Sequence, residues 1–418
     1  MAPSNRLEGI HTMDHDPRTD IINRQYEKYP YPEPIADLDE WSKHSWEWFD
    51  PSKGAHRMLW PDKEYRPDLD ILIAGCGTNQ AACFAYGNPQ AKVVAVDISE
   101  ASLDHQRCLK AKHNLTNLEL HRLPIEELPT LGRDFDLVVS TGVLMIMADP
   151  VAGLKAIGEC MRRDGAIGLM LYAHHGRFGV YLLQSVFRTL GLGQDERSLQ
   201  MVRETLRLLH PDHPLHSYLK YAPDLDSDAG MVDTFLIGRD VGYTVEDCLD
   251  LVESAGLAFQ GWFVNSPYHP HTIDGGGTAL YTALNALPPR QMWSAMECLW
   301  TSNGCHFFMA CRRDRPPASY QIDLASPKAL DYVPEWRYRC GLSDNEIFRP
   351  RWRFPLNPES LSYARLVDGT RSIREIAALV GDGPASAATA RRIFEDLRRL
   401  DVVAMALPPP LNPLFRNG

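Results

Sequence analysis

The chain lacks several features that would place it at once in a class of protein. Its 418 residues contain no apolar run near the roughly 20 residues that a membrane-spanning helix needs. The opening residues are polar and acidic, and carry no hydrophobic leader. A net charge of -11 gives no overall basic surface for nucleic acid. We therefore expect no membrane association, and nucleic acid is a disfavoured partner.

Cysteine is also used sparingly, at nine scattered positions with no C-x-x-C pair. This pattern indicates reduced thiols and a cytoplasmic location. A His-x-His pair at His269 and His271, with Cys305 and His306 further on, has two of the residue types that bind zinc. Because nothing in the spacing fixes two more ligands, we predict no metal site.

From Leu69 to Arg312 short β-branched runs alternate with helical stretches. The runs are DILIAG, KVVAVD, LELHRL, FDLVVST, GAIGLMLYA, AFQGWFV and CHFFMACRR. Such alternation predicts an α/β fold, a parallel sheet covered by helices on both faces. Residues 176–241 break the pattern, so we expect a partly helical, irregular insertion there.

The two ends of the chain differ from this central part. Near the start, QYEKYPYPEP has prolines that exclude a continuous helix, so we expect a short helix ending near Tyr29 and then an extended strap. Near the end, apolar residues on one face predict a small three-helix unit with a terminal β-wing. The expected organisation is an N-terminal strap region at 1–66, a domain at 67–314, a linker at 315–360 and a winged-helix-like domain at 361–418.

The strongest chemical signal is ILIAGCGTNQ, a buried strand that leads into a glycine-rich turn and a helix. Glycine lets backbone N–H groups approach a ligand closely, and the helix N-terminus adds partial positive charge. Asp97 ends the next strand, 22 positions after Gly75. A carboxylate there accepts the hydroxyls of a ribose, so the spacing predicts a nucleoside site at the edge of the sheet.

These motifs, with FDLVVSTGVLMIMADP and VEDCLDLVESAGLAFQGWF, resemble those of class I S-adenosylmethionine-dependent methyltransferases. The resemblance covers residues 20–314. It is greatest to bacterial methyltransferases fused to tetratricopeptide repeats, which share the strap motif from Tyr26 to Pro32; the repeats themselves are absent here. It implies a Rossmann-like sheet of seven strands, the last one antiparallel, and S-adenosyl-L-methionine as the cofactor.

The resemblance also assigns residues to the cofactor. It places the glycine turn at the methionine half, Asp97 at the ribose, and the residues after Asp97 beside the adenine. Two positions depart from the family pattern: Asn79 replaces its third glycine, and Pro124 replaces an aspartate that touches the adenine. The expected cofactor-binding set is Gly75, Cys76, Gly77, Gln80, Asp97, Ile98, Ser99, Ile125, Thr141 and Gly142.

The residues that would bind the methyl acceptor are marked by less specific motifs than those of the cofactor site. Tyr29 and Tyr31 lie two residues apart in the strap, so an extended chain puts both on one face, over the reactive end of the cofactor; the alternative is simple packing of the arm. His174 and His175 follow the fifth strand and have a suitable pKa for a general base, although structural histidines fit as well. We expect Tyr31, His174 and His175 in catalysis, and Tyr29, Tyr172, Arg177 and Asp233 at the substrate.

The favoured function is methyl transfer to a heteroatom of a protein or peptide, because LVDGTRSIREIAALV resembles winged-helix modules that recognise peptide precursors. The alternatives are a small-molecule acceptor and an inactive cofactor-binding scaffold. An open groove reaching residues 360–405 favours a peptide, and a closed pocket favours a metabolite. A homodimer is compatible with the sequence.

Overall fold

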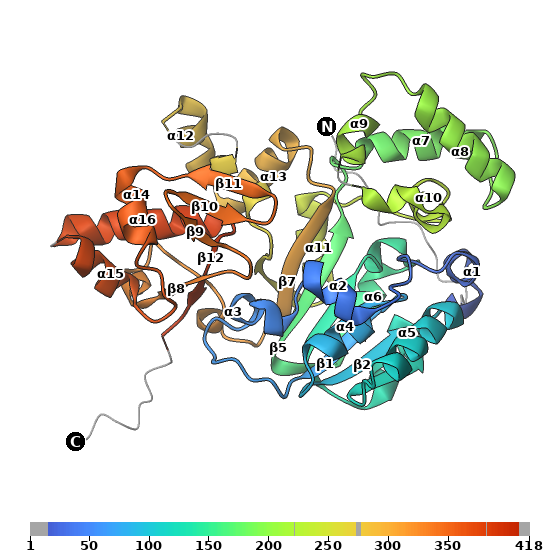
Figure 1. Ribbon diagram of the computed structural model, residues 1–418, viewed down its shortest axis with the longest axis horizontal. Coiled ribbons are helices and arrows are strands. Elements are labelled where there is room, and N and C mark those ends of the chain that lie inside the picture. The colour runs from blue at the N-terminus through green and yellow to red at the C-terminus, as the bar shows by residue number, and fades with distance from the viewer. Residues whose placement is uncertain (1–15, 221, 273–276, 382, 409–418) are drawn as a thin grey trace.

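The computed structural model describes residues 16–220, 222–272, 277–381 and 383–408. A large sheet lies at the centre, a group of helices covers one end of it, and a smaller α/β unit from the last part of the chain packs at its side (Figure 1). No helix among the described residues combines the length and the hydropathy needed to cross a membrane.

The central sheet has seven strands in the order β3-β2-β1-β4-β5-β7-β6. β7 pairs antiparallel with both β5 and β6, whereas the other neighbours are parallel. This confirms the predicted sheet and its antiparallel last strand. The strands are β1 (Asp70–Ala74), β2 (Lys92–Asp97), β3 (Leu118–Arg122), β4 (Phe135–Thr141), β5 (Met161–Tyr172), β6 (Leu257–Trp262) and β7 (Cys305–Arg312).

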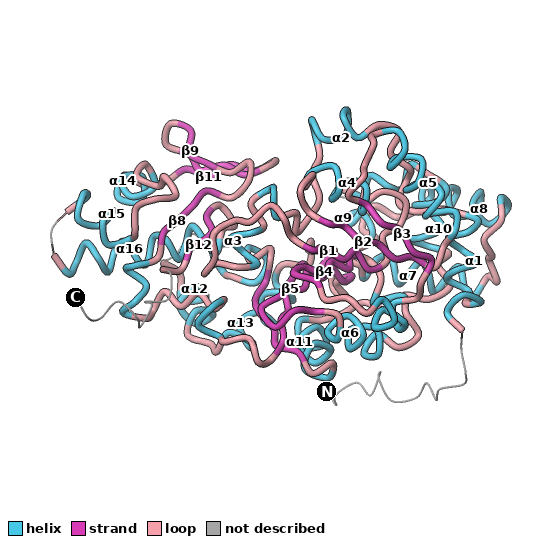
Figure 2. Tube along the Cα trace, turned by 90° about the horizontal axis from the view of Figure 1, so that it is seen from below, coloured by secondary structure: helices cyan, strands magenta, loops and turns pink. Residues whose placement is uncertain are grey.

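Helices cover both faces of this sheet, as Figure 2 shows, with α4 and α5 on one side and α6 and α11 on the other. Each face has its own hydrophobic core. Side chains fix where the helices begin: Ser99 caps α5, Asp149 caps α6 with Pro150 at its first turn, and Thr244 forms a capping box in α11. The helices are α4 (Gln80–Gly87), α5 (Glu100–Lys112), α6 (Pro150–Glu159) and α11 (Val245–Ser254).

The insertion at 176–241 is more regular than its sequence suggests. It forms a helical unit with a separate core, which we call the roof. A second helical insertion between β6 and β7, which we did not predict, consists of α12 (Ala279–Asn285) and α13 (Pro289–Leu299). The roof helices are α7 (Phe178–Thr189), α8 (Glu196–Leu208), α9 (Leu215–Leu219) and α10 (Asp228–Phe235).

The N-terminal arm has the expected short helix followed by an extended strap. α1 (Ile21–Lys28) has Tyr29 as its C-cap. Two further short helices follow the strap, α2 (Leu38–His44) and α3 (His56–Leu59). The strap crosses the glycine turn, where Thr78 Oγ1 donates to Pro32 O at 2.5 Å and Asn79 Nδ2 donates to Glu33 O at 2.8 Å. The arm is therefore fixed to the edge of the sheet by side chains of the turn itself.

Residues 315–360 are not a linker, so that prediction is wrong. They contain β8 to β11, and Tyr332 and Ile347 are buried in one core with the helices that follow. The prolines are compatible with ordered structure here: Pro317 and Pro327 begin short helices, and Pro334 and Pro355 lie in strands at sheet edges. The strands are β8 (Val333–Trp336), β9 (Gly341–Ser343), β10 (Glu346–Arg349) and β11 (Trp352–Pro355).

The three expected C-terminal helices are present as α14 (Pro358–Ala364), α15 (Ile373–Val380) and α16 (Pro384–Arg399). The expected wing is different: β12 (Val403–Ala406) pairs antiparallel with β8, which precedes the helices in the chain. The winged-helix arrangement is not confirmed. β8 to β12 and α14 to α16 together are called the C-terminal unit below.

One buried carboxylate joins the C-terminal unit to the large sheet domain. Asp401 is 5% exposed and accepts hydrogen bonds from the backbone N–H of Asn265 at 2.7 Å and of Ser266 at 2.8 Å. It also accepts from Arg337 Nη1 at 2.9 Å and Arg349 Nη1 at 3.2 Å. Removing this carboxylate takes an acceptor from two arginines and two backbone N–H groups at the interface, although Arg349 Nη1 keeps its hydrogen bond to Ser266 Oγ.

We therefore expect Asp401→Ala to lower the free energy of unfolding by about 3–5 kcal/mol, the usual cost of removing one partner of a buried charge pair. Denaturant unfolding of the full chain measures this. The control is Asp331→Ala, which removes a half-exposed ion pair with Arg374 and is expected to cost less than about 1 kcal/mol. Equal losses in the two variants would show that Asp401 does not hold the interface.

Candidate active site

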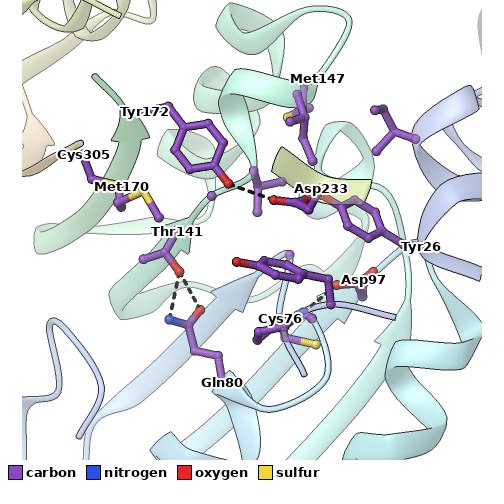
Figure 3. A pocket seen from close by; sticks show the side chains of 18 of the residues that line it. Tyr26, Cys76, Gln80, Asp97, Thr141, Met147, Met170, Tyr172, Asp233 and Cys305 are labelled. Atoms are coloured by element: carbon purple, nitrogen blue, oxygen red, sulfur yellow. Dashed lines mark hydrogen bonds between the residues drawn. The ribbon is translucent and has the colours of Figure 1, made fainter. Parts of the chain in front are cut away.

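A cavity of about 1760 Å³ lies at the carboxyl ends of the central strands, between the N-terminal arm and the roof (Figure 3). Pockets that hold one small ligand usually span roughly 300–1,000 Å³, so this cavity has room for a cofactor and an acceptor together. Nine of the ten predicted cofactor-binding residues line it: Gly75, Cys76, Gly77, Gln80, Asp97, Ile98, Ile125, Thr141 and Gly142.

The glycine turn requires its glycines. Gly75 and Gly77 have φ values of 80° and 52°, in the left-handed region that other residues rarely adopt. A Cβ on Gly75 would lie 2.4 Å from Val143 Cγ2, and one on Gly77 would lie 2.8 Å from Tyr31 O. The turn can therefore pack against the strap and against the loop after β4 only with glycine at both positions.

Asn79, which replaces the third glycine of the family pattern, has a structural role of its own. Its side chain donates from Nδ2 to Glu33 O and accepts at Oδ1 from Ile35 N at 2.9 Å. It is 4% exposed. The departure from the family pattern therefore fixes the strap over the turn and does not obstruct the cavity.

Asp97 ends β2 with its carboxylate at the cavity. Oδ2 accepts from Gly77 N at 2.8 Å and Oδ1 accepts from Ser99 N at 2.9 Å. Burial raises the pKa of this carboxyl, against these two backbone donors, which lower it. The carboxylate thus fixes the glycine turn and remains available to ribose hydroxyls in the cavity.

Ser99 does not line the cavity, so its predicted place beside the adenine is wrong. Its Oγ accepts from Ser102 N at 3.2 Å as the N-cap of α5 and donates to Tyr26 O at 3.4 Å. The side chain is fully buried. Capping of the helix takes precedence over contact with a ligand at this position.

A carboxyl that the sequence did not indicate lies beside Gln80. Gln80 Nε2 donates to Thr141 Oγ1 at 2.9 Å and to Glu47 Oε2 at 3.2 Å, so these three side chains form one group at the cavity wall. Burial raises the pKa of Glu47 to about 7. Glu47 comes from the aromatic segment after the strap, where no motif marks it; only the folded chain brings it to the glycine turn.

On the opposite side of the cavity, Asp233 from α10 accepts two tyrosine hydroxyls. Tyr26 of α1 donates to Oδ1 at 2.7 Å and Tyr172 of β5 donates to Oδ2 at 3.1 Å. Figure 3 shows Tyr172 and Asp233 pointing toward each other across the cavity from Cys76 and Gln80. Asp233 and Tyr172 were predicted at the substrate, and both line the cavity; Tyr26, part of the strap motif, was not singled out.

Arg177 also lines the cavity, as predicted, and its Nε and Nη2 are buried without a hydrogen-bond partner among the described residues. Its guanidinium carbon lies 3.7 Å from the centre of the Tyr172 ring, and Nη1 donates to the Tyr218 hydroxyl at 2.8 Å. Nη2 lies 3.9 Å from Asp240 Oδ2. Arg177 is 2% exposed, so it acts mainly as a buried support for Tyr172.

Three residues expected on the acceptor side also lie outside the cavity lining. Tyr29 ends α1, where its N–H still bonds to Gln25 O, so it does not share an extended face with Tyr31; its ring packs against the roof. The backbone N–H of His174 donates to Tyr243 O at 2.8 Å, and the ring Nε2 of His175 lies 4.0 Å from Cys298 Sγ. The chain turns after β5, which brings Arg177 to the cavity in place of the histidines. Tyr31 does line it.

No group of three or more His, Cys, Asp or Glu side chains suited to a metal ion occurs among the described residues. The His-x-His pair lies near the C-terminal unit, where His271 Nε2 is 2.7 Å from Asp396 Oδ1.

The sequence of the chain is similar to those of known proteins. Residues 66–185 match the family model described as "Methyltransferase domain". An uncharacterized protein of Synechococcus sp. is 26% identical over 363 residues, which are 84% of each chain. A tRNA U34 carboxymethyltransferase of Pseudomonas paraeruginosa is 27% identical over 176 residues, 40% of this chain; the chain spans about half (52%) of that relative.

Among solved structures, PKMT2 from Rickettsia typhi shares the fold, with a TM-score of 0.61 and 14% identity over 87% of this chain and 77% of that one. The same protein in complex with AdoHcy gives a TM-score of 0.60. Residues 66–185 therefore match a methyltransferase domain within a Rossmann-like sheet, which supports S-adenosylmethionine as the expected cofactor. The finer resemblance to methyltransferases fused to tetratricopeptide repeats stays a prediction.

The residues present fit this cofactor. The glycine turn would present backbone to the methionine half, Asp97 would present a carboxylate to the ribose, and Ile98 and Ile125, which also line the cavity, would present apolar surface to the adenine. The cofactor supplies an electrophilic methyl group on a sulfonium. The chain's own part is to bind and orient it, to exclude water with the strap, and to align an acceptor.

We expect Asp97→Ala to weaken S-adenosylmethionine binding by about 1–3 kcal/mol, roughly 5-fold to 150-fold, because ribose hydroxyls and turn N–H groups lose their acceptor. Isothermal titration calorimetry measures this. Asp104→Ala, an exposed acid on the neighbouring helix α5, is the control and should leave the affinity within about twofold. Unchanged affinity in Asp97→Ala would refute the ribose assignment.

Cofactor affinity should also depend on pH through Glu47. Its pKa of about 7 means that the carboxyl ionises as pH rises from 6 to 7.5, and the resulting carboxylate attracts the cationic cofactor. Affinity should then rise by up to about eightfold, the ratio of ionised fractions at these two pH values. Titrations at both pH values test this. In Glu47→Gln the rise should disappear, and in the exposed Glu40→Gln it should persist; a rise retained in Glu47→Gln would contradict the assignment.

Proposed function

We propose that this chain transfers a methyl group from S-adenosylmethionine to a nucleophilic heteroatom of a small molecule that binds beneath the roof. The observation that carries the proposal is the carboxylate of Asp233, on the side of the cavity opposite the glycine turn. A buried carboxylate in that place can orient an acceptor N–H or O–H group and take up its proton.

The shape of the cavity supports a small acceptor. The roof and the loop before β7 contribute Tyr218, Asp233, Arg239 and Asn303 to its lining, so the acceptor side is covered. Among the described lining residues, none comes from 360–405. The lining of the large cavity itself therefore does not extend to the part of the chain that an open peptide groove was expected to reach.

A protein or peptide acceptor, which the sequence favoured, is the second candidate. Trp48 supports it, since this side chain is 40% exposed and lines both the large cavity and a smaller one of about 270 Å³. The smaller cavity is shared with Arg337, Tyr338 and Trp352 of the C-terminal unit. A side chain presented from that direction would enter past Trp48.

We also propose a cytoplasmic location. No disulfide joins the nine cysteines, all of which lie within the described residues. Reduced thiols are usual in that compartment.

The test is methyl transfer from labelled S-adenosylmethionine into a cell lysate by the full chain, followed by separation of protein from small molecules. We expect label in the small-molecule fraction. Asp233→Ala should lower the rate roughly 100-fold or more, the usual range for loss of a positioned proton acceptor. Asp228→Ala, at the exposed start of the same helix, should not.

Label found only in the protein fraction would favour the second candidate, a protein or peptide acceptor. Binding of S-adenosylmethionine in calorimetry with no label in either fraction would instead favour the inactive cofactor-binding scaffold, and failure to bind it would overturn the proposal. Asn79 no longer argues for that scaffold, because its side chain holds the strap in place.

A further inference from the structure

We propose that the acceptor is an amine, whose nitrogen binds at the carboxylate of Asp233 between Tyr26 and Tyr172. This inference rests on the proposed function and names the chemical class of the acceptor. It is argued from the charge of the cavity, the burial of Asp233 and the state of the two tyrosines.

The first argument is the charge of the cavity wall. Among the described lining residues, two carry a cationic side chain, Arg177 and Arg239. Both face carboxylates: Arg239 Nη2 lies 2.7 Å from Asp20 Oδ2, and Arg177 Nη2 lies 3.9 Å from Asp240 Oδ2. Seven acids line the same cavity: Asp20, Glu33, Glu47, Asp97, Glu126, Asp149 and Asp233. The field of such a wall attracts a cationic acceptor and repels an anionic one.

The second argument is the burial of Asp233, which is 2% exposed. Removing a carboxylate from water is costly unless hydrogen bonds and an opposite charge compensate it. Two phenol donors supply the hydrogen bonds, and they reach it from two other segments of the chain, α1 and β5. An ammonium group arriving in the cavity adds a positive charge beside this carboxylate.

The third argument concerns Tyr26 and Tyr172. Burial, together with the carboxylate of Asp233, holds the pKa of both phenols well above its usual range, so both remain donors at neutral pH. One face of the Tyr172 ring is covered by the guanidinium of Arg177. The hydroxyls and the remaining ring surface of Tyr26, with Tyr31 also in the lining, give a cation an aromatic as well as an anionic environment.

The reaction follows from these positions. Asp233 accepts one proton from the bound ammonium, which leaves a neutral amine with a lone pair. The lone pair forms the new N–C bond to the methyl carbon while the S–C bond breaks with its electron pair remaining on sulfur. The products are the N-methylated ammonium and the neutral thioether S-adenosylhomocysteine, and the proton on Asp233 passes to solvent on release.

The experiment measures ligand binding directly and needs no knowledge of the natural acceptor. The full chain, saturated with S-adenosylhomocysteine, is titrated with n-butylammonium and, as the matched anion, with butyrate, and binding is followed by ligand-observed NMR. We expect n-butylammonium to bind and butyrate not to bind. Asp233→Asn, which keeps the shape and one acceptor oxygen, should weaken n-butylammonium at least tenfold and change the affinity for S-adenosylhomocysteine less than twofold.

The matched control is Asp228→Asn, the same chemical change on the same helix α10, where the carboxylate pairs with Arg203 at the surface. This variant should bind n-butylammonium and S-adenosylhomocysteine as tightly as the unchanged chain does. Binding of butyrate at least as tight as that of n-butylammonium, no binding of n-butylammonium, or equal binding in Asp233→Asn would overturn the amine assignment. If the chain binds S-adenosylhomocysteine but shows any of these outcomes, the proposed methyl transfer stands and only the amine acceptor is refuted. If the chain does not bind S-adenosylhomocysteine, both proposals are refuted.

Discussion

The bonds that Asp233 receives from Tyr26 and Tyr172 connect the three parts of the chain on which the cavity depends. Tyr26 belongs to the N-terminal arm, Tyr172 ends a central strand, and Asp233 lies in the roof. This junction is a side-chain anchor that holds the roof over the end of β5. The same carboxylate that holds the parts together faces the space where an acceptor must lie, so packing and chemistry depend on one side chain.

The opposite wall follows from a second constraint, the close approach of the strap to the glycine turn. A Cβ on Gly77 would lie too close to Tyr31 O, and Thr78 and Asn79 bind the strap carbonyls of Pro32 and Glu33. A turn that must accept both a backbone strap and a cofactor has little room for variation. The cofactor site is thus built from two segments that lie some 45 residues apart in sequence, strap and turn.

Much of this was accessible from the sequence, because it depends on short-range patterns. The seven strands follow from runs of buried β-branched residues, and Asp97 follows from its spacing to Gly75. The errors arose at helix ends and where tertiary contacts decide. Tyr29 is the C-cap of α1, Ser99 is the N-cap of α5, and the histidines after β5 lie outside the cavity lining. Prolines made residues 315–360 resemble a linker, although their apolar residues complete the core of the C-terminal unit.

We infer that the cofactor and Asp233 face each other across one cavity. A crystal structure of the full chain with S-adenosylhomocysteine tests this arrangement. We expect ribose hydroxyls on the Asp97 carboxylate and the sulfur atom turned toward Tyr172 and Asp233, with open space between them for an acceptor. A ligand bound away from Asp97, or with its sulfur directed away from Asp233, would contradict it.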